Sequence, residues 1–203
     1  LYSTGEVKCW GSDASGQLGN DAAFASSNVP VFVSGLTNAT AITAGANHSC
    51  ALLSTGRIYC WGLDTDGQLG NGGSGGSGIP VQVSTYTDFD RVAAGGNTTC
   101  ARRTNEAVYC WGDDSSGQLG NGGSNTDATT PTSIGSYPSG SNVEILSVGL
   151  LHACAVFSTG EVNCWGLNSS GQLGDNSTTS YDTPRSVNGY SAAGGADVQA
   201  GGS

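Results

Sequence analysis

The sequence predicts an all-β repeat array over residues 1–203, and three observations carry that prediction. The tripeptide Cys-Trp-Gly recurs four times, at spacings of 51, 50 and 54 residues, and each copy continues into Gly-Gln-Leu-Gly. Stretches with apolar residues at every second position follow the first two copies, as expected for strands. Glycine supplies 34 of the 203 residues, which favours many tight turns.

The composition excludes several classes of function. Six Lys and Arg stand against 16 Asp and Glu, giving a net charge of −10, so we expect no nucleic-acid partner. No apolar run is long enough to cross a bilayer, and no leader peptide opens the chain, so we expect no membrane span. The chain contains no Met and starts at Leu1, which we interpret as a processed product or a segment of a longer protein.

Edge strands are expected about 19 residues after each Cys-Trp-Gly motif. Residues 29–33 and 79–83 alternate valine or isoleucine with other residues, and Pro30 and Pro80 interrupt them. Proline cannot donate a ladder hydrogen bond, so it is tolerated mainly on edge strands. Pro131 and Pro184 lie in the same register of the third and fourth repeats, and we expect an edge strand in each repeat.

A hairpin is predicted between Cys50 and Cys60. If residues 54–56 form a three-residue loop whose glycine takes the left-handed conformation, Leu53 closes against Arg57. Counting outward from that hydrogen-bonded pair places Cys50 opposite Cys60 in a non-hydrogen-bonded pair. Their Cα atoms should then approach to about 4.5 Å, which suits a disulfide.

The same count predicts two further disulfides and leaves one cysteine over. In the third repeat Glu106 occupies the loop position that glycine fills in the other hairpins. A non-glycine residue is strained in the left-handed conformation, so the turn type stays open, while the spacing still predicts the cysteine pairing. Disulfides imply an oxidising compartment, so we expect an extracellular, secreted or cell-surface protein, and cysteines ten apart do not resemble a zinc knuckle. The expected pairs are Cys50–Cys60, Cys100–Cys110 and Cys154–Cys164, with Cys9 unpaired or paired outside the segment.

The two ends of the chain interrupt the same repeat phrase. The expected partner of Cys9 would lie two positions before Leu1, and residues 200–203 match residues 44–47. Three explanations stay open: a longer array, which we favour, a ring closed within one chain, or a junction between neighbouring molecules. The repeat units are about 1–43 (completed by 200–203 or by missing residues), 44–93, 94–147 and 148–199.

The repeated phrase resembles a known family. Cys-Trp-Gly-x-[Asp/Asn]-x-x-Gly-Gln-Leu-Gly, preceded by Cys-Ala-Leu-Leu-Ser-Thr-Gly, is similar to the regulator of chromosome condensation repeat, in its secreted, cysteine-containing variety. The resemblance covers nearly the whole chain and implies a β-propeller with blades of four-stranded antiparallel sheet. Family rings usually have seven blades, so either more repeats lie outside this segment or the four blades form an open or partner-completed arc.

Paired glycines and two apolar side chains in each motif predict how blades pack. The glycines permit tight turns and a close approach between sheets, and the leucine and tryptophan should form an inter-blade core. The glycines are Gly16 and Gly19, Gly67 and Gly70, Gly117 and Gly120, and Gly171 and Gly174. The apolar residues are Leu18, Leu69, Leu119, Leu173, Trp10, Trp61, Trp111 and Trp165.

Other polar motifs favour structural roles, so we expect no catalytic residue, metal or cofactor. His48 and His152 recur at one repeat position, which favours packing or hydrogen bonding between blades. We interpret four aspartates as solvated turn carboxylates, because the later glutamate of a calcium loop is absent. These are Asp64, Asp66, Asp113 and Asp114. The run 70–76 reads as a glycine-serine loop without the strand-turn-helix context of a nucleotide or hydrolase motif.

Five N-glycosylation sequons occur, of which Asn38 and Asn176 lie in turn-like stretches and are the better acceptors. Asn47 and Asn97 stand close to the disulfide strands, where we expect shielding. The fifth is Asn168.

The functional prediction is a non-enzymatic extracellular scaffold whose repeats, or neighbouring copies, stack head to tail. The alternative is a secreted protein-binding module or enzyme inhibitor of propeller type, whose partner would be another secreted protein. Aromatic anchors dominate interface energies, and five aromatic residues in the variable loops keep the alternative open. They are Tyr86, Phe89, Tyr137, Tyr181 and Tyr190. Guanine-nucleotide exchange is not expected from an acidic, disulfide-bonded chain.

Overall fold

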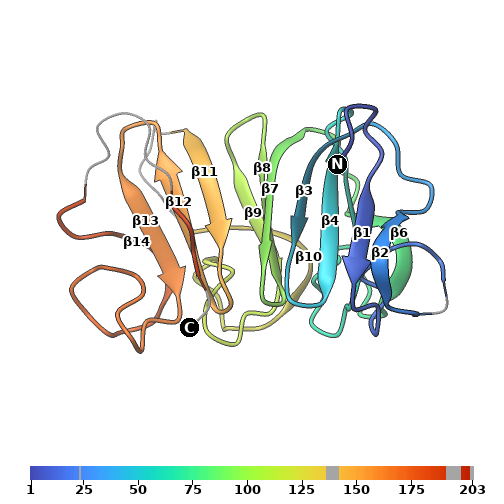
Figure 1. Cartoon of the computed structure of the whole chain (residues 1–203). Helices are drawn as coiled ribbons and strands as arrows, with labels where there is room; N and C mark the ends of the chain where they lie inside the picture. The colour runs from blue at the N-terminus through green and yellow to red at the C-terminus, as the bar shows by residue number, and fades with distance from the viewer. Residues whose placement is uncertain (23, 136–141, 191–197, 202–203) are drawn as a thin grey trace.

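The computed structural model describes residues 1–22, 24–135, 142–190 and 198–201, and all regular secondary structure in those ranges is β-strand. The strands form three four-stranded antiparallel sheets and one two-stranded sheet, which stand side by side as blades of an arc (Figure 1). The all-β prediction is therefore confirmed. The prediction of four-stranded antiparallel blades is confirmed in the second, third and fourth blades, and the described residues of the first repeat unit form two strands.

The first blade lies at one end of the arc and the fourth blade at the other (Figure 1). The first comprises β1 (Lys8–Gly11) and β2 (Ser27–Phe32). The second comprises β3 (Ala39–Ala44), β4 (His48–Leu53), β5 (Ile58–Gly62) and β6 (Ser77–Gln82). The third comprises β7 (Phe89–Gly95), β8 (Thr98–Arg103), β9 (Val108–Gly112) and β10 (Ala128–Ser133). The fourth comprises β11 (Val143–Val148), β12 (His152–Phe157), β13 (Val162–Gly166) and β14 (Tyr181–Ser186).

The strands of each full blade pair in chain order, and the Cys-Trp-Gly motif lies on the third strand. The first strands of neighbouring blades are bonded to one another. Ala94 donates its backbone N–H to Thr43 Oγ1 at 2.9 Å, and Ala46 donates to the Gly96 carbonyl at 2.8 Å. β1 and β2 correspond to the third and fourth strands, so β1 has no second strand beside it in the described residues.

The hairpins have the register that the sequence predicts. Leu53 donates its N–H to the Arg57 carbonyl at 2.9 Å, and Cys50 faces Cys60 across β4 and β5. Glu106 takes φ +70° where the other loops have glycine, so the third hairpin keeps the same turn and pairing. Disulfides join Cys50 to Cys60, Cys100 to Cys110 and Cys154 to Cys164, each with a Cα–Cα distance of 4.1 Å.

The hydrophobic core lies between blades. One buried cluster combines Ile58 and Leu69 of the second blade with Phe89 and Trp111 of the third. Another combines the third blade with the fourth. The predicted edge strands are also confirmed, because Pro30 and Pro80 lie in β2 and β6, each of which pairs on one side only. A single blade therefore buries its apolar face only by packing on a neighbour.

Candidate functional site

One tryptophan joins each full blade to the blade before it. Trp61 donates its Nε1–H to the Gln17 carbonyl at 2.9 Å, and its ring covers Gly19. A Cβ at Gly19 would lie 2.6 Å from the indole, so only glycine permits this approach. The two further sets are Trp111 with Gln68 and Gly70, and Trp165 with Gln118 and Gly120.

A second glycine of the motif allows the last strand of the following blade to pack closely against the loop. A Cβ at Gly67 would lie 2.6 Å from Thr129 Cα on β10, and Gly72 donates its N–H to the Thr129 carbonyl at 2.9 Å. Each inter-blade contact thus has an indole, a backbone approach and a hydrogen bond between loop and strand.

Trp10 has the same place in the first blade but lacks this contact. Its side chain is 65% exposed, whereas Trp61, Trp111 and Trp165 are at most 1% exposed. The prediction that all four tryptophans form an inter-blade core is therefore wrong for Trp10. The physical reason is that the glycine loop receiving each indole belongs to the preceding blade, and no described blade precedes the first.

The first blade carries two other exposed aromatic rings, and together with Trp10 they form what we call the N-terminal apolar surface. The Tyr2 and Phe32 rings lie 6.3 Å apart, and Lys8 Nζ lies 4.2 Å from the Phe32 ring centroid. Contiguous exposed apolar area of this kind marks interaction sites in soluble proteins. The surface consists of Tyr2, Trp10 and Phe32, each at least 49% exposed.

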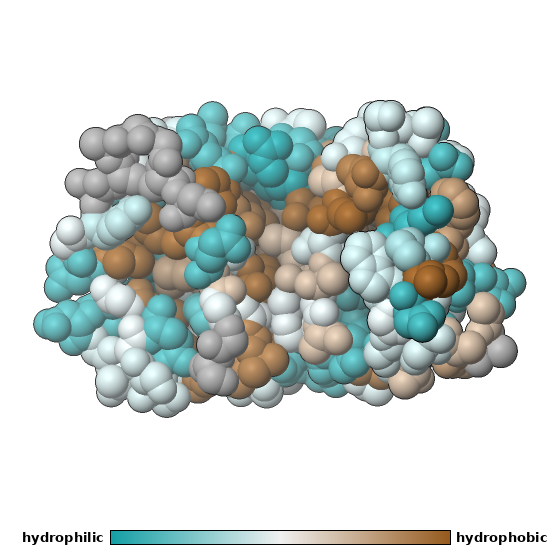
Figure 2. Space-filling view, in the orientation of Figure 1, coloured by the Kyte–Doolittle hydropathy of each residue, from teal (hydrophilic) through white to brown (hydrophobic). Residues whose placement is uncertain are grey.

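A hollow of about 380 Å³ lies beside β1, lined among others by Cys9, Trp10, Ile42 and His48. Ile42 on β3 is 46% exposed there, although first strands elsewhere contact one another. Figure 2 shows hydrophobic residues in the hollowed middle of this view, over β3 and over β11 to β13.

Cys9 is the one free cysteine among the described residues. It faces Val31 on β2, and the strand that carries the partner cysteine in other blades has no counterpart beside it. Burial raises the pKa of its half-buried thiol, which disfavours the nucleophilic thiolate. This chemistry does not favour a catalytic cysteine.

The fourth blade presents the other half of the inter-blade contact, which we call the C-terminal face. It comprises Gly171, Gln172, Gly174 and Asn176, beside a cavity of about 300 Å³ that Gln172 and Gly174 line together with Tyr190 and Val198. The nearest atom to a Cβ at Gly171 is the Ser177 carbonyl at 4.0 Å. At the three equivalent glycines the backbone of the next blade lies within 3 Å.

Two of the four motif aspartates are buried, which corrects the prediction of solvated turn carboxylates. Asp64 is 0% and Asp114 is 1% exposed. Asp64 Oδ1 accepts the Leu69 N–H at 2.9 Å, which closes the glycine loop, and Oδ2 has no hydrogen-bond partner. Burial raises the pKa of each carboxyl to about 6. Asp66 and Asp113 are half-buried and accept hydrogen bonds from Asn97 and Ser115.

The fourth blade has Asn168 at the same position, and both the oxygen and the nitrogen of its amide form hydrogen bonds. Its Oδ1 accepts the Leu173 N–H at 2.9 Å, and its Nδ2 donates to the Thr179 carbonyl at 3.0 Å. In the fourth blade a side-chain N–H donor therefore occupies the position that Oδ2 of Asp64 or Asp114, which has no hydrogen-bond partner, occupies in the second and third blades.

The two histidines lie in the packing between strands and blades, as the sequence predicts. His48 Nε2 lies 2.8 Å from Thr99 Oγ1 on the next blade. Burial lowers the pKa of His48 to about 4 and also lowers the pKa of His152. Both are therefore neutral at physiological pH.

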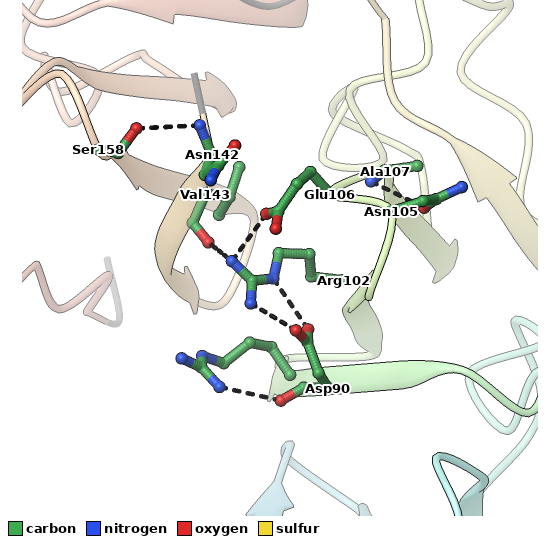
Figure 3. A network of polar contacts seen from close by, with 9 residues as sticks. Asp90, Arg102, Asn105, Glu106, Ala107, Asn142, Val143 and Ser158 are labelled. Carbon is green, nitrogen blue, oxygen red and sulfur yellow. Dashed lines mark hydrogen bonds and ion pairs between the residues drawn. The ribbon is translucent and has the colours of Figure 1, made fainter. Parts of the chain in front are cut away.

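Arg102 links the third blade to the fourth, as Figure 3 shows. Its Nε donates to Asp90 Oδ1 at 2.8 Å, Nη1 lies 2.9 Å from Glu106 Oε2, and Nη1 also donates to the Val143 carbonyl on β11. The guanidinium therefore has a structural role, because its contacts to Asp90, Glu106 and Val143 lie within the protein.

The variable-loop aromatics do not form the binding cluster that the sequence left open. Phe89 is buried, and Tyr86 packs edge-on against it with Arg103 over its ring. Tyr181 is half-buried beneath Arg185. Tyr190 is exposed, and Tyr137 lies outside the described residues.

The five sequons differ in exposure. Asn38 and Asn176 are exposed. Asn47 is exposed too, which corrects the expected shielding there, because it lies in the loop before β4 and not within the strand. Asn97 is half-buried and donates its Nδ2 to Asp66. Asn168 is 0% exposed with its amide fully engaged. An oligosaccharide could reach only the first three in the folded chain.

The described residues contain no group of three or more His, Cys, Asp or Glu that could hold a metal. Those same ranges contain no helix long and apolar enough to cross a membrane.

Comparison with known proteins agrees with this repeated geometry. The family model for the regulator of chromosome condensation (RCC1) repeat matches residues 4–52, 55–102, 105–156 and 159–203. RCC1 domain-containing protein 1 of Homo sapiens is 32% identical over 190 residues, covering 92% of this chain and 46% of the relative. The ultraviolet-B receptor UVR8 of Arabidopsis thaliana is 36% identical over 151 residues, covering 73% of this chain and 34% of the relative. The chain spans about half the length of these relatives, or less.

Solved structures share the fold. Human WBSCR16 is 23% identical with a TM-score of 0.84, covering 99% of this chain and 52% of that one. Yeast RCC1 (Prp20), solved bound to Kap60, is 21% identical with a TM-score of 0.77, covering 90% and 44%. At such identities the likeness concerns fold alone.

Proposed function

This chain belongs to the regulator of chromosome condensation (RCC1) repeat family, and from that premise we propose that it is a non-enzymatic, extracellular protein-interaction scaffold. The observation that carries the proposal is the N-terminal apolar surface, where the first blade exposes the three aromatic side chains Tyr2, Trp10 and Phe32. Its most exposed member, Trp10, is of a residue type that is enriched among interface anchors.

Extracellular placement is supported by the cysteines. Six of the seven pair within hairpins, and such bonds persist in oxidising compartments. The low charge content of 11% and the glycine-rich loops suit a structural surface that has no charged substrate to recognise.

A secreted binding module is the second candidate, and the same apolar surface favours it. Yeast RCC1 (Prp20), which shares this fold, was solved bound to another protein, Kap60. The two candidates differ in the partner: a scaffold contacts repeats of its own kind, whereas a module contacts an unrelated secreted protein.

Two measurements test the proposal. Thiol titration of the secreted 203-residue chain should find one thiol before reduction and seven after it. Seven thiols in the native chain would contradict the extracellular assignment.

Photo-crosslinking then tests the surface. A photoreactive amino acid replacing Trp10 should give covalent protein adducts, while the same residue replacing the exposed Thr104, in the hairpin of the third blade, should give few. Adducts to the chain itself favour the scaffold, and adducts to an unrelated protein favour the module. Equal or absent adducts at both positions would refute the interaction role.

A further inference from the structure

We propose that the glycine loops of the second and third blades each bind a calcium ion, with Asp64 and Asp114 as the carboxylate ligands. A glycine loop here means the segment from the motif aspartate to the last strand of its blade, residues 64–76 and 114–127. These sites are separate from the N-terminal apolar surface and do not rest on its interaction role. Two buried oxygens carry the proposal, and the fourth blade supplies the reference for what surrounds them.

Each of the two aspartates holds one oxygen that no described residue satisfies. Asp64 Oδ1 accepts the Leu69 N–H at 2.9 Å, and Asp114 Oδ1 accepts the Leu119 N–H at 3.0 Å. Oδ2 of each side chain is buried and has no hydrogen-bond partner among the described residues. An unpaired buried carboxylate oxygen is costly, so the fold favours a positive or hydrogen-bond-donating group beside each Oδ2.

The fourth blade shows what surrounds such a group. Asn168 has the same backbone position and the same Oδ1 bond, here to the Leu173 N–H, and its Nδ2 replaces the unpaired oxygen. Four oxygens lie within 3.3 Å of that nitrogen, although an amide has only two hydrogens to donate. They are Asp175 Oδ1, the Ser177 carbonyl, Ser177 Oγ and the Thr179 carbonyl, at 3.1, 3.2, 3.3 and 3.0 Å. The loop therefore surrounds a group of partial positive charge with oxygens.

The loop of the second blade follows the same path. Asn71 lies seven residues after Asp64, which is the spacing that separates Asp175 from Asn168. Asn71 Oδ1 accepts the N–H two residues further on at 2.8 Å, as Asp175 Oδ1 does at 3.0 Å. The oxygens that correspond to those around Asn168 Nδ2 are Asn71 Oδ1 and the carbonyls of Gly73 and Gly75. Asp64 Oδ2 therefore faces acceptors only.

The loop of the third blade is one residue longer and closes in the same way. Asn121 Oδ1 accepts the Gly123 N–H at 2.7 Å, and Asp114 donates its N–H to Asp127 Oδ1 at 3.0 Å. Asn168 donates its N–H to Ser180 Oγ at 3.0 Å, so residue 127 corresponds to residue 180. The oxygens that correspond to those around Asn168 Nδ2 are Asn121 Oδ1 and the carbonyls of Gly123 and Thr126.

The ligand chemistry favours calcium. Carboxylate, amide and carbonyl oxygens are the ligands of Ca²⁺, which takes about six to eight of them in a flexible geometry. Each loop supplies four, and water can supply the rest, because residues 71–76 and 122–127 are exposed. Zinc prefers nitrogen and sulfur, which these loops do not offer at this position. Glycine at positions 73, 75 and 123 lets the carbonyls turn toward the ion.

The fourth blade satisfies its own oxygens without an ion. Asn168 Nδ2 donates to Asp175 Oδ1, so the amide and the carboxylate pair with each other. The second and third blades reverse the pair, since the carboxylate comes first and the amide seven residues later. The sequence does not reveal these sites, because only one ligand in each loop is a carboxylate.

Calcium should bind weakly and stabilise the contacts between blades. With one carboxylate in each site we expect a dissociation constant of about 1 mM. The loops pack on the following blade, where Gly72 donates its N–H to the Thr129 carbonyl at 2.9 Å and Gly122 donates to the Asp182 carbonyl at 2.7 Å. Calcium at about 10 mM should therefore raise the melting temperature by about 5–10 °C relative to EDTA.

Equilibrium dialysis of the 203-residue chain against calcium chloride tests the proposal. At about 0.15 M sodium chloride, which screens loose binding to the acidic surface, we expect two ions per chain. Asp64→Asn and Asp114→Asn should each leave one ion, and the double variant should leave none, because each amide reproduces the fourth blade. Asp113→Asn is the matched control, since its carboxylate accepts the Ser115 N–H outside the pocket. It should keep both ions.

Terbium luminescence gives a second reading on the same variants. The indole of Trp111 covers Gly70 and that of Trp165 covers Gly120, so each loop lies beside a tryptophan that can excite a bound Tb³⁺ ion. The emission should be displaced by calcium, fall in each single variant and disappear in the double variant. Circular dichroism in EDTA checks that the asparagine variants fold.

A gain of function tests the reference blade. Asn168→Asp places a second carboxylate beside Asp175 and removes the amide that fills the pocket. The variant should bind a third ion, more tightly than the other two, because carboxylate count raises calcium affinity. It is folded and assayed in calcium, where the added charge is neutralised.

Three results would overturn the proposal. These are no saturable binding up to about 20 mM calcium, two ions retained by the folded double variant, and an equal loss of binding in Asp113→Asn. None of them bears on the interaction role of Trp10, which photo-crosslinking tests separately.

Discussion

The first blade and the third blade carry the same Cys-Trp-Gly phrase, yet their tryptophans have opposite environments. Trp111 is 0% exposed and bonded to the Gln68 carbonyl of the preceding blade, whereas Trp10 is 65% exposed. The phrase therefore encodes a contact between two blades and does not by itself encode burial. Repeat arrays bury apolar faces only on neighbours, so an identical residue is core in one blade and interface in another.

The largest effect should separate these two tryptophans. Trp111→Ala removes an indole from the core between the second and third blades, and we expect it to lower the free energy of unfolding by about 3–5 kcal/mol. Trp10→Ala should change it by less than about 0.5 kcal/mol in dilute, monomeric protein. Denaturant titration followed by circular dichroism measures both. Similar losses for the two variants would mean that Trp10 is buried in solution.

The cysteines allow the same comparison. Cys60→Ser opens the hairpin disulfide of the second blade and should cost about 2 kcal/mol, because the loop it closes is short. Cys9→Ser removes a thiol that bridges nothing among the described residues, so its stability should stay close to that of the parent chain. Denaturant midpoints under non-reducing conditions give the difference. Complete unfolding of Cys60→Ser would show that disulfides, more than inter-blade packing, hold the sheets.

Local features of this fold could be predicted because local spacing determines them. The hairpin around residues 54–56 follows from counting outward from its glycine, and the same count holds at Glu106, where the backbone keeps the left-handed turn without glycine. The edge position of β6 follows from Pro80, since proline removes a ladder donor. These inferences need no knowledge of neighbouring blades.

The candidate site depended on contacts across blades, which spacing does not reveal. Trp10 is exposed because no second strand and no preceding loop lie beside it in the part of the chain that the structure describes, and the repeat offset at residues 200–203 was the available signal. The burial of Asp64 was missed because a Gly-rich acidic loop resembles a solvated turn. In the folded chain that loop packs against the next blade, and the carboxylate closes it from inside.

A smaller change in stability should separate the glycine loops that carry a buried aspartate from the loop of the fourth blade, which carries Asn168. Asp64→Asn gives the second blade the amide that Asn168 uses, and we expect about 1 kcal/mol of added stability at pH 7. Asp113→Asn removes the same charge from a half-buried site and serves as the control, with little change expected. Thermal unfolding of the two variants decides this. A loss of stability in Asp64→Asn would mean that the buried oxygen accepts a hydrogen bond.

The same carboxyls predict a pH dependence of stability. Their folded pKa of about 6 lies above the ordinary value of 3.8, so folding favours the protonated form. Their contribution is full below pH 3.8 and declines as the pH rises through about 6. The double variant Asp64→Asn, Asp114→Asn should lose this decline between pH 4 and 7. An unchanged pH profile in the double variant would assign the dependence to other groups.

The smallest effect concerns the third hairpin, where two contributions oppose each other. Glu106 holds φ +70°, and glycine would relieve a left-handed strain of about 1 kcal/mol. The carboxylate also lies 2.9 Å from Arg102 Nη1, and Arg102 joins the third blade to β11. Arg102 keeps its bonds to Asp90 in the variant, so the lost ion pair should cost a similar amount. Glu106→Gly should therefore shift stability by less than about 0.5 kcal/mol, measured by denaturant titration. A loss well beyond that would show that Glu106 positions the guanidinium, and that charge contributes to the inter-blade contact alongside the indole.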